Sequence, residues 1–248
     1  MYNNLRIKKI QPWNDLIGVW IKTNLQIRQG IKRNLLVWEW LLNGNALDTS
    51  GFWNNLTETS ITYSETNIWY QKNQCEFNWS TWRLNAWATI IPVWKKSISF
   101  WVKSSYTAWY QTIISNSRWD SNETWTAVYI DITTWKINFQ IRNWAAPILA
   151  ITSTGNICDW LWKHIVCIGE WDTTTNWYSI YINWVINVQW TASAIESWTP
   201  TNNMRVGVLA NDTLYDLNGS MTNIRIYSWN IWALWVLSLY MEWLKLLH

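Results

Sequence analysis

Glycine is scarce in this chain of 248 residues, in which it occurs eight times while Trp occurs 27 times. Gly makes up about 7% of an average protein, or roughly 17 residues in a chain of this length. His164 and His248 are the only histidines, which leaves little scope for a histidine metal site. Cys75, Cys158 and Cys167 lack the Cys-x-x-Cys spacing of zinc sites. We therefore expect free thiols, with a disulfide between Cys158 and Cys167 as the alternative in an exported protein.

Charged residues are also few, at 14% of the chain, and they are unevenly distributed. Residues 1–34 hold seven Lys or Arg against one Asp, a net charge of +6, whereas residues 35–248 hold 12 against 15, a net charge of −3. The mildly acidic body argues against nucleic-acid binding. The basic segment is interpreted as a solvated face or as an attachment arm, and its alternating residues 5–10 and 19–27 predict a small N-terminal β-hairpin.

Long hydrophobic runs are absent. The apolar residues 17–21 are too few for the core of a secretory signal. Residues 231–241 are strongly apolar, but Glu242 and Lys245 follow, so the run falls short of the roughly 20 residues that span a bilayer. We therefore predict no membrane span and a short C-terminal helix.

Alternation of apolar and polar residues is the clearest pattern that is present. Residues 162–168, 178–182 and 185–189 alternate, with a polar loop at 172–176 and a two-residue turn at Asn183 and Trp184. Such a pattern predicts three half-buried antiparallel strands joined in a meander. Asn, Thr and Ser fill the gaps between further apolar runs, which favours an all-β sandwich over a helical bundle.

Trp stands at turn positions where Gly is usual. A two-residue hairpin turn needs positive φ at both central residues, which a residue without a Cβ adopts freely. The affected sites include Trp79, Trp119, Trp135, Trp144, Trp177 and Trp184. Some bacterial lineages and their phages read the codon UGA as Gly, so we predict that many of these Trp represent Gly. The alternative is a truly Trp-rich protein. Trp20, Trp40, Trp101 and Trp162 lie inside apolar runs and are expected to be authentic.

The segment 35–55 carries the most specific motif, Leu-Val-Trp-Glu-Trp-Leu-Leu-Asn-Gly-Asn-Ala-Leu-Asp within it. With Gly at Trp38 and Trp53, it resembles the opening of bacterial laminin G-like, concanavalin A-like domains. The later landmarks follow in order at 75–80, 97–103, 110–115, 159–166, 178–184 and 219–227. The resemblance covers about residues 35–241. It implies a jelly-roll sandwich of two antiparallel sheets over residues 35–248, with the N-terminal hairpin at 1–34 outside it.

The resemblance also implies a structural Ca²⁺ site. Asn43, Asn45 and Asp48 offer side-chain oxygens near the start of the domain, and Asn223 lies in the closing segment. Thr222 and Asn223 stand where the family commonly has acidic residues, which would weaken such a site. The alternative is that these side chains cap turns.

Loop residues suggest a sugar-binding surface. Aromatic rings stack on the apolar faces of sugars, while Asn and Asp orient hydroxyl groups. Tyr106, Asn116, Asp120 and Asn122 are the predicted contacts. Tyr110 is a further candidate, although its position also fits packing within the sheet.

Catalysis is the less favoured interpretation. Some relatives with this fold hydrolyse glucans with a Glu-x-Asp-x-Glu strand. Here Glu170 and Asp172 begin that pattern, but Thr174 stands where the second Glu should be. We therefore expect a non-catalytic module that binds a glycan or another surface ligand on a bacterial surface or a phage particle. The alternatives are a structural surface or virion protein without glycan affinity and a glycoside hydrolase.

Overall fold

The computed structural model describes residues 35–65, 73–78, 82–87, 91–92, 95–105, 107–116, 125–143, 146–171, 176–192, 203–209 and 215–245. The chain forms two compact units, Met1–Asn34 and Leu35–His248, and every described residue belongs to the second. The predicted hairpin at 1–34 lies outside the described residues. No helix in the described part of the chain is long and apolar enough to cross a membrane.

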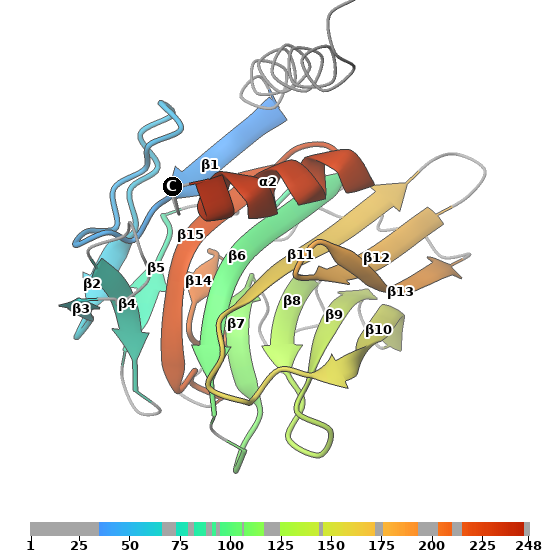
Figure 1. Ribbon diagram of the computed structural model, residues 1–248, viewed down its shortest axis with the longest axis horizontal. Helices are drawn as coiled ribbons and strands as arrows, with labels where there is room; N and C mark the ends of the chain where they lie inside the picture. The colour runs from blue at the N-terminus through green and yellow to red at the C-terminus, as the bar shows by residue number, and fades with distance from the viewer. Residues whose placement is uncertain are drawn as a thin grey trace, which may run out of the picture. The chain divides into compact units, whose positions relative to one another are not determined.

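The described unit is a sandwich of two sheets in which every strand pairing is antiparallel (Figure 1). The eight-stranded sheet runs in the order β13 (Val185–Ala192), β12 (Asn176–Ile182), β11 (Lys163–Trp171), β6 (Lys96–Ser104), β15 (Gly219–Tyr227), β4 (Asn73–Phe77) and β3 (Thr62–Glu65), with β1 (Leu36–Trp40) also beside β15. The seven-stranded sheet runs β10 (Ala146–Asn156), β9 (Lys136–Asn143), β8 (Trp125–Ile130), β7 (Gln111–Ser115), β14 (Arg205–Val206), β5 (Arg83–Asn85) and β2 (Thr57–Thr59). The predicted all-β fold of two antiparallel sheets is confirmed.

The predicted meander is formed by β11, β12 and β13, which pair in sequence order. Its two-residue turn has φ of 49° at Asn183 and 66° at Trp184, so both residues occupy the left-handed region, as the turn length requires. The Asn183 side chain also accepts a hydrogen bond from the backbone N–H of His164, at 3.0 Å. The turn is therefore fixed to the start of β11.

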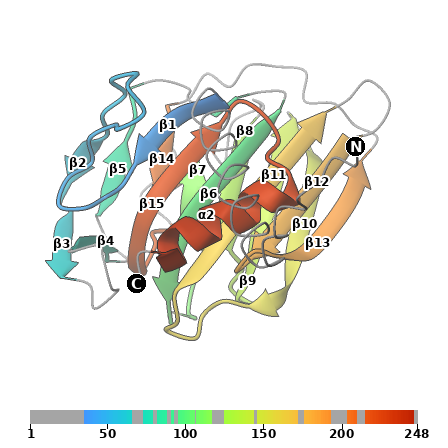
Figure 2. The same cartoon turned by 45° about the horizontal axis from the view of Figure 1, so that its top comes forward.

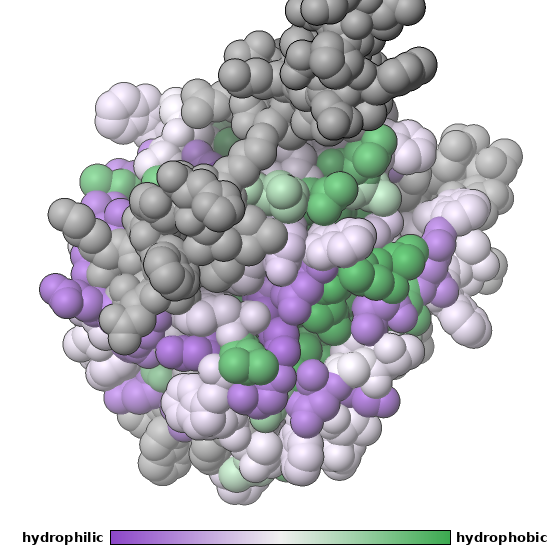
Figure 3. Space-filling model, viewed as in Figure 1, coloured by the Kyte–Doolittle hydropathy of each residue, from purple (hydrophilic) through white to green (hydrophobic). Residues whose placement is uncertain are grey.

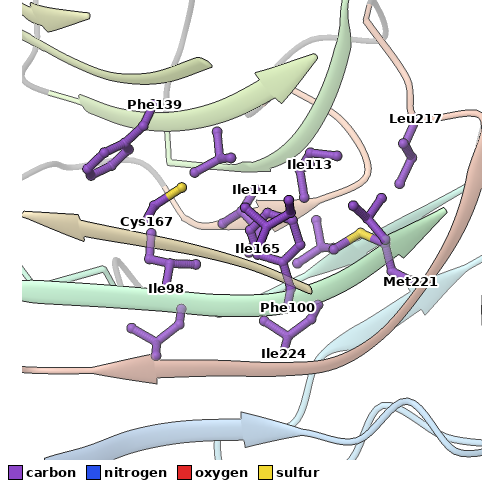
Figure 4. Close-up of a cluster of buried hydrophobic side chains, with 14 of the residues drawn as sticks. Ile98, Phe100, Ile113, Ile114, Phe139, Ile165, Cys167, Leu217, Met221 and Ile224 are labelled. Atoms are coloured by element: carbon purple, nitrogen blue, oxygen red, sulfur yellow. The ribbon is translucent and has the colours of Figure 1, made fainter. Parts of the chain in front are cut away.

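The hydrophobic core lies between the two sheets, where alternate residues of each strand meet (Figure 4). Phe100 and Ile165 come from the eight-stranded sheet, and Phe139 comes from the seven-stranded sheet. Cys75 and Cys167 are buried in this core as free thiols, and burial raises the pKa of both. Cys158 is free too, so the disulfide alternative is not formed.

The helix α2 (Ala233–Lys245) covers the outer face of the eight-stranded sheet (Figures 1 and 2). Its Val236 and Leu239 pack with Val166, Ile168 and Tyr227 in a second hydrophobic cluster. Burying each large apolar side chain stabilises the fold by about 1.5–3 kcal/mol. The predicted C-terminal helix is confirmed, and its packing explains why the residues leading into it are apolar.

An aromatic stack is part of the helix-covered face. Trp101 lies 5.0 Å from the ring of His164 and 5.7 Å from the ring of Tyr240, and both pairs are stacked. The His164 Nε2 atom is 2.9 Å from the hydroxyl of Ser99. Trp101 and His164 are buried, so this stack fixes α2 to strands β6 and β11.

Candidate binding face

The two outer faces of the sandwich are not equivalent. α2 covers the outer face of the eight-stranded sheet, whereas no helix among the described residues covers the outer face of the seven-stranded sheet (Figure 2). Strand alternation sets what that uncovered face presents. In β9, Ile137, Phe139 and Ile141 point into the core, so Asn138 and Gln140 point outward.

A row of polar side chains crosses four strands of this face. The register pairs Thr112 of β7 with Tyr129 of β8, Tyr129 with Asn138 of β9, and Asn138 with Thr152 of β10. Residues opposite one another in a sheet project from the same face, so these four side chains form one line, here called the polar row. The Thr152 hydroxyl donates a hydrogen bond of 2.5 Å to the Asn138 side-chain oxygen.

Gln140 adds an amide group next to the polar row. Its strand neighbours in the register are Ala127, which is buried, and Ala150, which is exposed. The Gln140 side chain is buried, at 9% exposed, as are Thr112 and Asn138 of the polar row, at 2% and 6%. Its amide, which both donates and accepts hydrogen bonds, therefore lies at the base of this face and not on its open surface.

Three tyrosines gather at one end of the polar row. Tyr110 meets Tyr129 edge to face at 6.0 Å and meets Tyr215 in the same manner at 5.7 Å. Edge-to-face pairs contribute about 0.5–1.5 kcal/mol each beyond their buried area. All three rings are partly exposed, so the cluster offers aromatic surface to solvent.

Tyr215 has a strained backbone. Its φ is 63°, a region that non-Gly residues occupy at a cost of about 1–3 kcal/mol. The backbone carbonyl of Tyr215 accepts a hydrogen bond from the N–H of Thr112 at 2.8 Å, which holds the strained residue beside the polar row. A strained residue of this kind persists only where the surrounding structure enforces its conformation. Such residues are common at ligand-binding sites.

Asp131 orders the hairpin that joins β8 to β9. Its Oδ1 atom accepts hydrogen bonds from the N–H and hydroxyl groups of Thr133 and Thr134, at 2.6 to 3.0 Å. Partial burial raises the pKa of Asp131, but these four hydrogen bonds outweigh it and the pKa is lowered. The hairpin fixes the register of Tyr129 against Asn138.

Of the four loop residues predicted to contact a sugar, only Asn116 is among the described residues. Tyr106, Asp120 and Asn122 lie outside the described residues. Asn116 is fully buried, and its side-chain oxygen accepts a hydrogen bond of 2.7 Å from the N–H of Thr126. Asn116 therefore holds the end of β7 against β8 instead of facing solvent. Asn116 was predicted to lie in an exposed loop because it follows the last residue of an apolar strand.

Asp48, one of the predicted calcium ligands, holds a turn. Its Oδ1 atom accepts hydrogen bonds from the N–H groups of Glu39 and Ser50 at 3.2 and 2.9 Å, and its Oδ2 atom accepts one from Asn54 at 2.9 Å. Three backbone donors thus share one carboxylate. This arrangement is the turn-capping alternative.

The other three predicted ligands do not complete a cation site. The side-chain oxygens of Asn43 and Asn45 accept hydrogen bonds from the N–H groups of Asn73 and Leu47, at 3.2 and 3.1 Å. The Asn223 Oδ1 atom is buried without a partner, but it supplies one neutral oxygen where Ca²⁺ takes six to eight. The described residues contain no group of three or more His, Cys, Asp or Glu that could hold a metal. These four residues therefore do not fit a shared calcium site.

The residues of the hydrolase alternative are only partly described. Glu170 belongs to β11, opposite Trp177 of β12. The side chain of Glu170 and the whole of Asp172 lie outside the described residues. The hydrolase interpretation stays a prediction.

Comparison with known proteins identifies the fold. No protein-family model matches the chain, and no curated protein sequence matches it. Among solved structures it is similar to domain 4 of AbnA, a GH43 extracellular arabinanase from Geobacillus stearothermophilus, in complex with arabinotriose. That match has a TM-score of 0.66 and 16% identity, and it covers 83% of this chain and 98% of that domain.

Two toxin domains are also similar. The binding domain of botulinum neurotoxin DC, in complex with rat synaptotagmin II, gives a TM-score of 0.64 with 13% identity over 85% of this chain and 52% of that one. The binding domain of Paraclostridial Mosquitocidal Protein 1 gives 0.65 with 12% identity over 85% and 53%. The chain thus spans about half the length of the toxin domains. At these identities the likeness establishes the fold alone, which is a jelly-roll β-sandwich shared with domains that bind carbohydrate or protein receptors.

Proposed function

We propose that the chain is a non-catalytic module that binds a neutral glycan on the outer face of its seven-stranded sheet. The observation that carries the proposal is the polar row beside the tyrosine cluster, on the outer face that α2 does not cover. We further propose that the module acts outside the cell or on a virion, as an adhesion or attachment domain.

The chemistry of this face suits a sugar. Tyr110 and Tyr215 present ring surface on which the C–H face of a sugar packs, and Gln140 and Thr152 supply groups that hydrogen-bond hydroxyls. No residue of the polar row or of the tyrosine cluster is charged, and neither is Gln140 nor its neighbours Ala127 and Ala150. Lys136 lies at the start of β9 on the same side as Asn138 and Gln140, so the charge is at one end of this face and the polar row itself offers only neutral hydrogen-bonding groups, which favours a neutral ligand.

The similar structures support a binding role without choosing the ligand. The AbnA domain holds arabinotriose, whereas the neurotoxin domain holds a protein receptor. One fold carries many functions, so the ligand must be argued from the site. The uncharged polar and aromatic surface favours the glycan over the protein. The alternative is a structural surface protein without glycan affinity. We also propose, from the sequence motifs, that the domain is laminin G-like.

A glycan array followed by calorimetry on the tightest ligand tests the proposal. We expect Tyr110→Ala to lower the affinity at least tenfold, since one lost packing contact is worth about 1.4 kcal/mol. Trp232→Ala is the matched control, because Trp232 is an aromatic residue 65% exposed beside α2. Its affinity should equal that of the wild type. An array without hits, or equal affinities for wild type and Tyr110→Ala, would overturn the proposal.

We also infer that some Trp of this chain stand where the natural protein has Gly. Trp53, Trp135, Trp160 and Trp184 have φ of 62°, 55°, 59° and 66°. A bulky residue in this region is a genuine outlier, whereas Gly enters it freely. All four side chains are exposed, by 39% to 85%.

The other described Trp do not have positive φ. Trp40 and Trp101 are buried, and the Trp40 indole N–H donates a hydrogen bond of 2.9 Å to the carbonyl of Asn54, as an authentic core Trp would. Trp38 and Trp177 lie in strands β1 and β12 without positive φ, so the backbone does not support Gly there. Trp79, Trp119 and Trp144 lie outside the described residues.

The gene and the native protein test this inference. UGA codons at Trp53, Trp135, Trp160 and Trp184, with UGG at Trp40 and Trp101, are expected. Mass spectrometry of peptides from the source organism should then show Gly at the four turn positions. Tryptophan in those native peptides would contradict the inference.

A further inference from the structure

The strands at the ends of the two sheets differ in how their free edges are protected. β2 has three residues, including Glu58, and β3 has four, including Glu65. β10 contains Pro147 and two irregularities of register. Short length, charge, proline and bulges are the devices that keep an edge strand from pairing with another chain.

β13 has almost none of these devices. Its eight residues, Val-Ile-Asn-Val-Gln-Trp-Thr-Ala, include no charged residue, Pro or Gly. Val185, Ile186 and Trp190 are exposed by 51%, 47% and 62%. Figures 1 and 2 show β13 at the rim of the eight-stranded sheet, and Figure 3 shows hydrophobic side chains exposed over this part of the molecule.

The first half of β13 is hydrogen-bonded to β10 through Asn187, and the second half pairs with β12 in an unbroken register. The side-chain oxygen of Asn187 accepts a hydrogen bond of 2.6 Å from the N–H of Thr154 on β10, at the point where the register with β12 shifts. From Val188 to Ala192 the register with β12 continues without a break. No other strand of the described residues pairs with the outer edge of this stretch, which therefore offers five regular residues centred on Trp190.

We propose that this stretch pairs antiparallel with the same stretch of a second copy, about a two-fold axis at Trp190, and so joins two eight-stranded sheets. An edge strand presents unpaired N–H and C=O groups, and a two-fold interface must be self-complementary. The axis places Trp190 opposite Trp190 of the second copy, Gln189 opposite Thr191, and Val188 opposite Ala192. Each pair joins like with like, aromatic, polar and apolar in turn.

A second copy fits this edge better than a different protein. The stretch carries no charge that would select a partner of opposite sign, and its centre matches its own reversed sequence in polarity. Five residues form a small interface, so the association should be weak and depend on concentration. The proposal does not rest on glycan binding.

Sedimentation velocity on the full chain tests the proposal. The mass of the wild type should rise with concentration from 29.7 kDa towards twice that value. Trp190→Lys and Trp190→Glu should each stay monomeric, because like charges would face each other across the axis. An equimolar mixture of the two variants should restore the dimer. Thr57→Lys, which places the same charge at an exposed position of edge strand β2, is the control and should dimerise as the wild type does.

The outcomes separate the parts of the proposal. A wild type that stays monomeric at every concentration overturns it, as does a Trp190→Lys variant that dimerises normally. Monomeric variants that do not associate when mixed place the axis elsewhere and overturn the assigned register. Circular dichroism shows whether the variants fold, and Thr191→Lys, at another exposed position of the stretch, is the second variant if Trp190→Lys does not.

Discussion

The two outer faces of the sandwich differ in what lies over them, and we propose that one serves stability and the other ligand binding. On the eight-stranded sheet, Val166, Ile168 and Tyr227 are apolar and lie under α2. On the seven-stranded sheet, Asn138 and Gln140 occupy corresponding outward positions and are polar; both are buried, although no helix of the described residues lies over them. Apolar outward residues need a cover, and uncharged polar ones beside aromatic rings suit a ligand. The difference predicts that substitutions on the two faces have different consequences.

The largest expected effect is on the helix-covered face. Trp101→Ala removes a buried indole that stacks on His164 and Tyr240, and large-to-small changes of this kind cost about 3–5 kcal/mol. Urea unfolding followed by circular dichroism measures the loss. Trp232→Ala, at an exposed position, should stay within about 0.5 kcal/mol of the wild type. Equal unfolding free energies for Trp101→Ala and Trp232→Ala would mean that the aromatic stack under α2 does not stabilise the fold.

The uncovered face should show the reverse behaviour. Gln140→Leu keeps the volume of the side chain and removes its amide, so the free energy of unfolding should change by less than about 1 kcal/mol. Glycan affinity should fall roughly tenfold, since about one hydrogen bond to the ligand is lost. Calorimetry with the tightest array ligand measures it. Unchanged affinity would mean that the amide of Gln140 lies outside the site.

A smaller effect distinguishes turns from strands. Trp184→Gly removes the cost of positive φ and should stabilise the protein by about 1 kcal/mol. Trp190→Gly, at an exposed strand position, should destabilise it by about 0.5–1 kcal/mol, because Gly weakens strands. Thermal unfolding of both variants at a concentration that keeps the wild type monomeric gives the two signs. If both substitutions changed the stability in the same direction, the result would argue against Gly at the turn.

The smallest effect concerns the hairpin beneath the uncovered face. The pKa of Asp131 is lowered by its hydrogen bonds, so its stabilising contribution is present above the usual pKa of about 3.9 and is lost as the pH falls through the lowered value. Because Asp131 is only partly buried and is screened by solvent, the contribution is below about 1 kcal/mol. The difference in unfolding free energy between wild type and Asp131→Ala should therefore shrink at acidic pH. If the difference in unfolding free energy grew at acidic pH, it would contradict the lowered pKa of Asp131.

The sequence predicted those parts of the fold that depend on local patterns. Alternation around Tyr178 and Ile180 identified the meander, and the apolar run before Glu242 identified the helix. The candidate face was missed, although residues 136–143 alternate polar and apolar. Alternation shows that a strand has two faces, but which face stays uncovered depends on α2, some ninety residues later in the chain.

Long-range register explains the rest of what sequence reasoning missed. Thr112 and Thr152 are forty residues apart and become part of one line only because β7, β8, β9 and β10 pair in a particular register. Asn116 was expected in a loop because its burial depends on Thr126 across the sheet. The turn at Asn183 and Trp184 was predictable, since the length of a hairpin turn fixes its φ values locally.

The most direct test is a titration of the ¹⁵N-labelled chain with the tightest array glycan, followed by backbone amide chemical shifts. The account predicts the largest shifts at Thr112, Tyr129, Asn138 and Thr152, with Leu239 of α2 unaffected. Largest shifts in α2, or none along the polar row, would contradict the assignment of the ligand to the uncovered face.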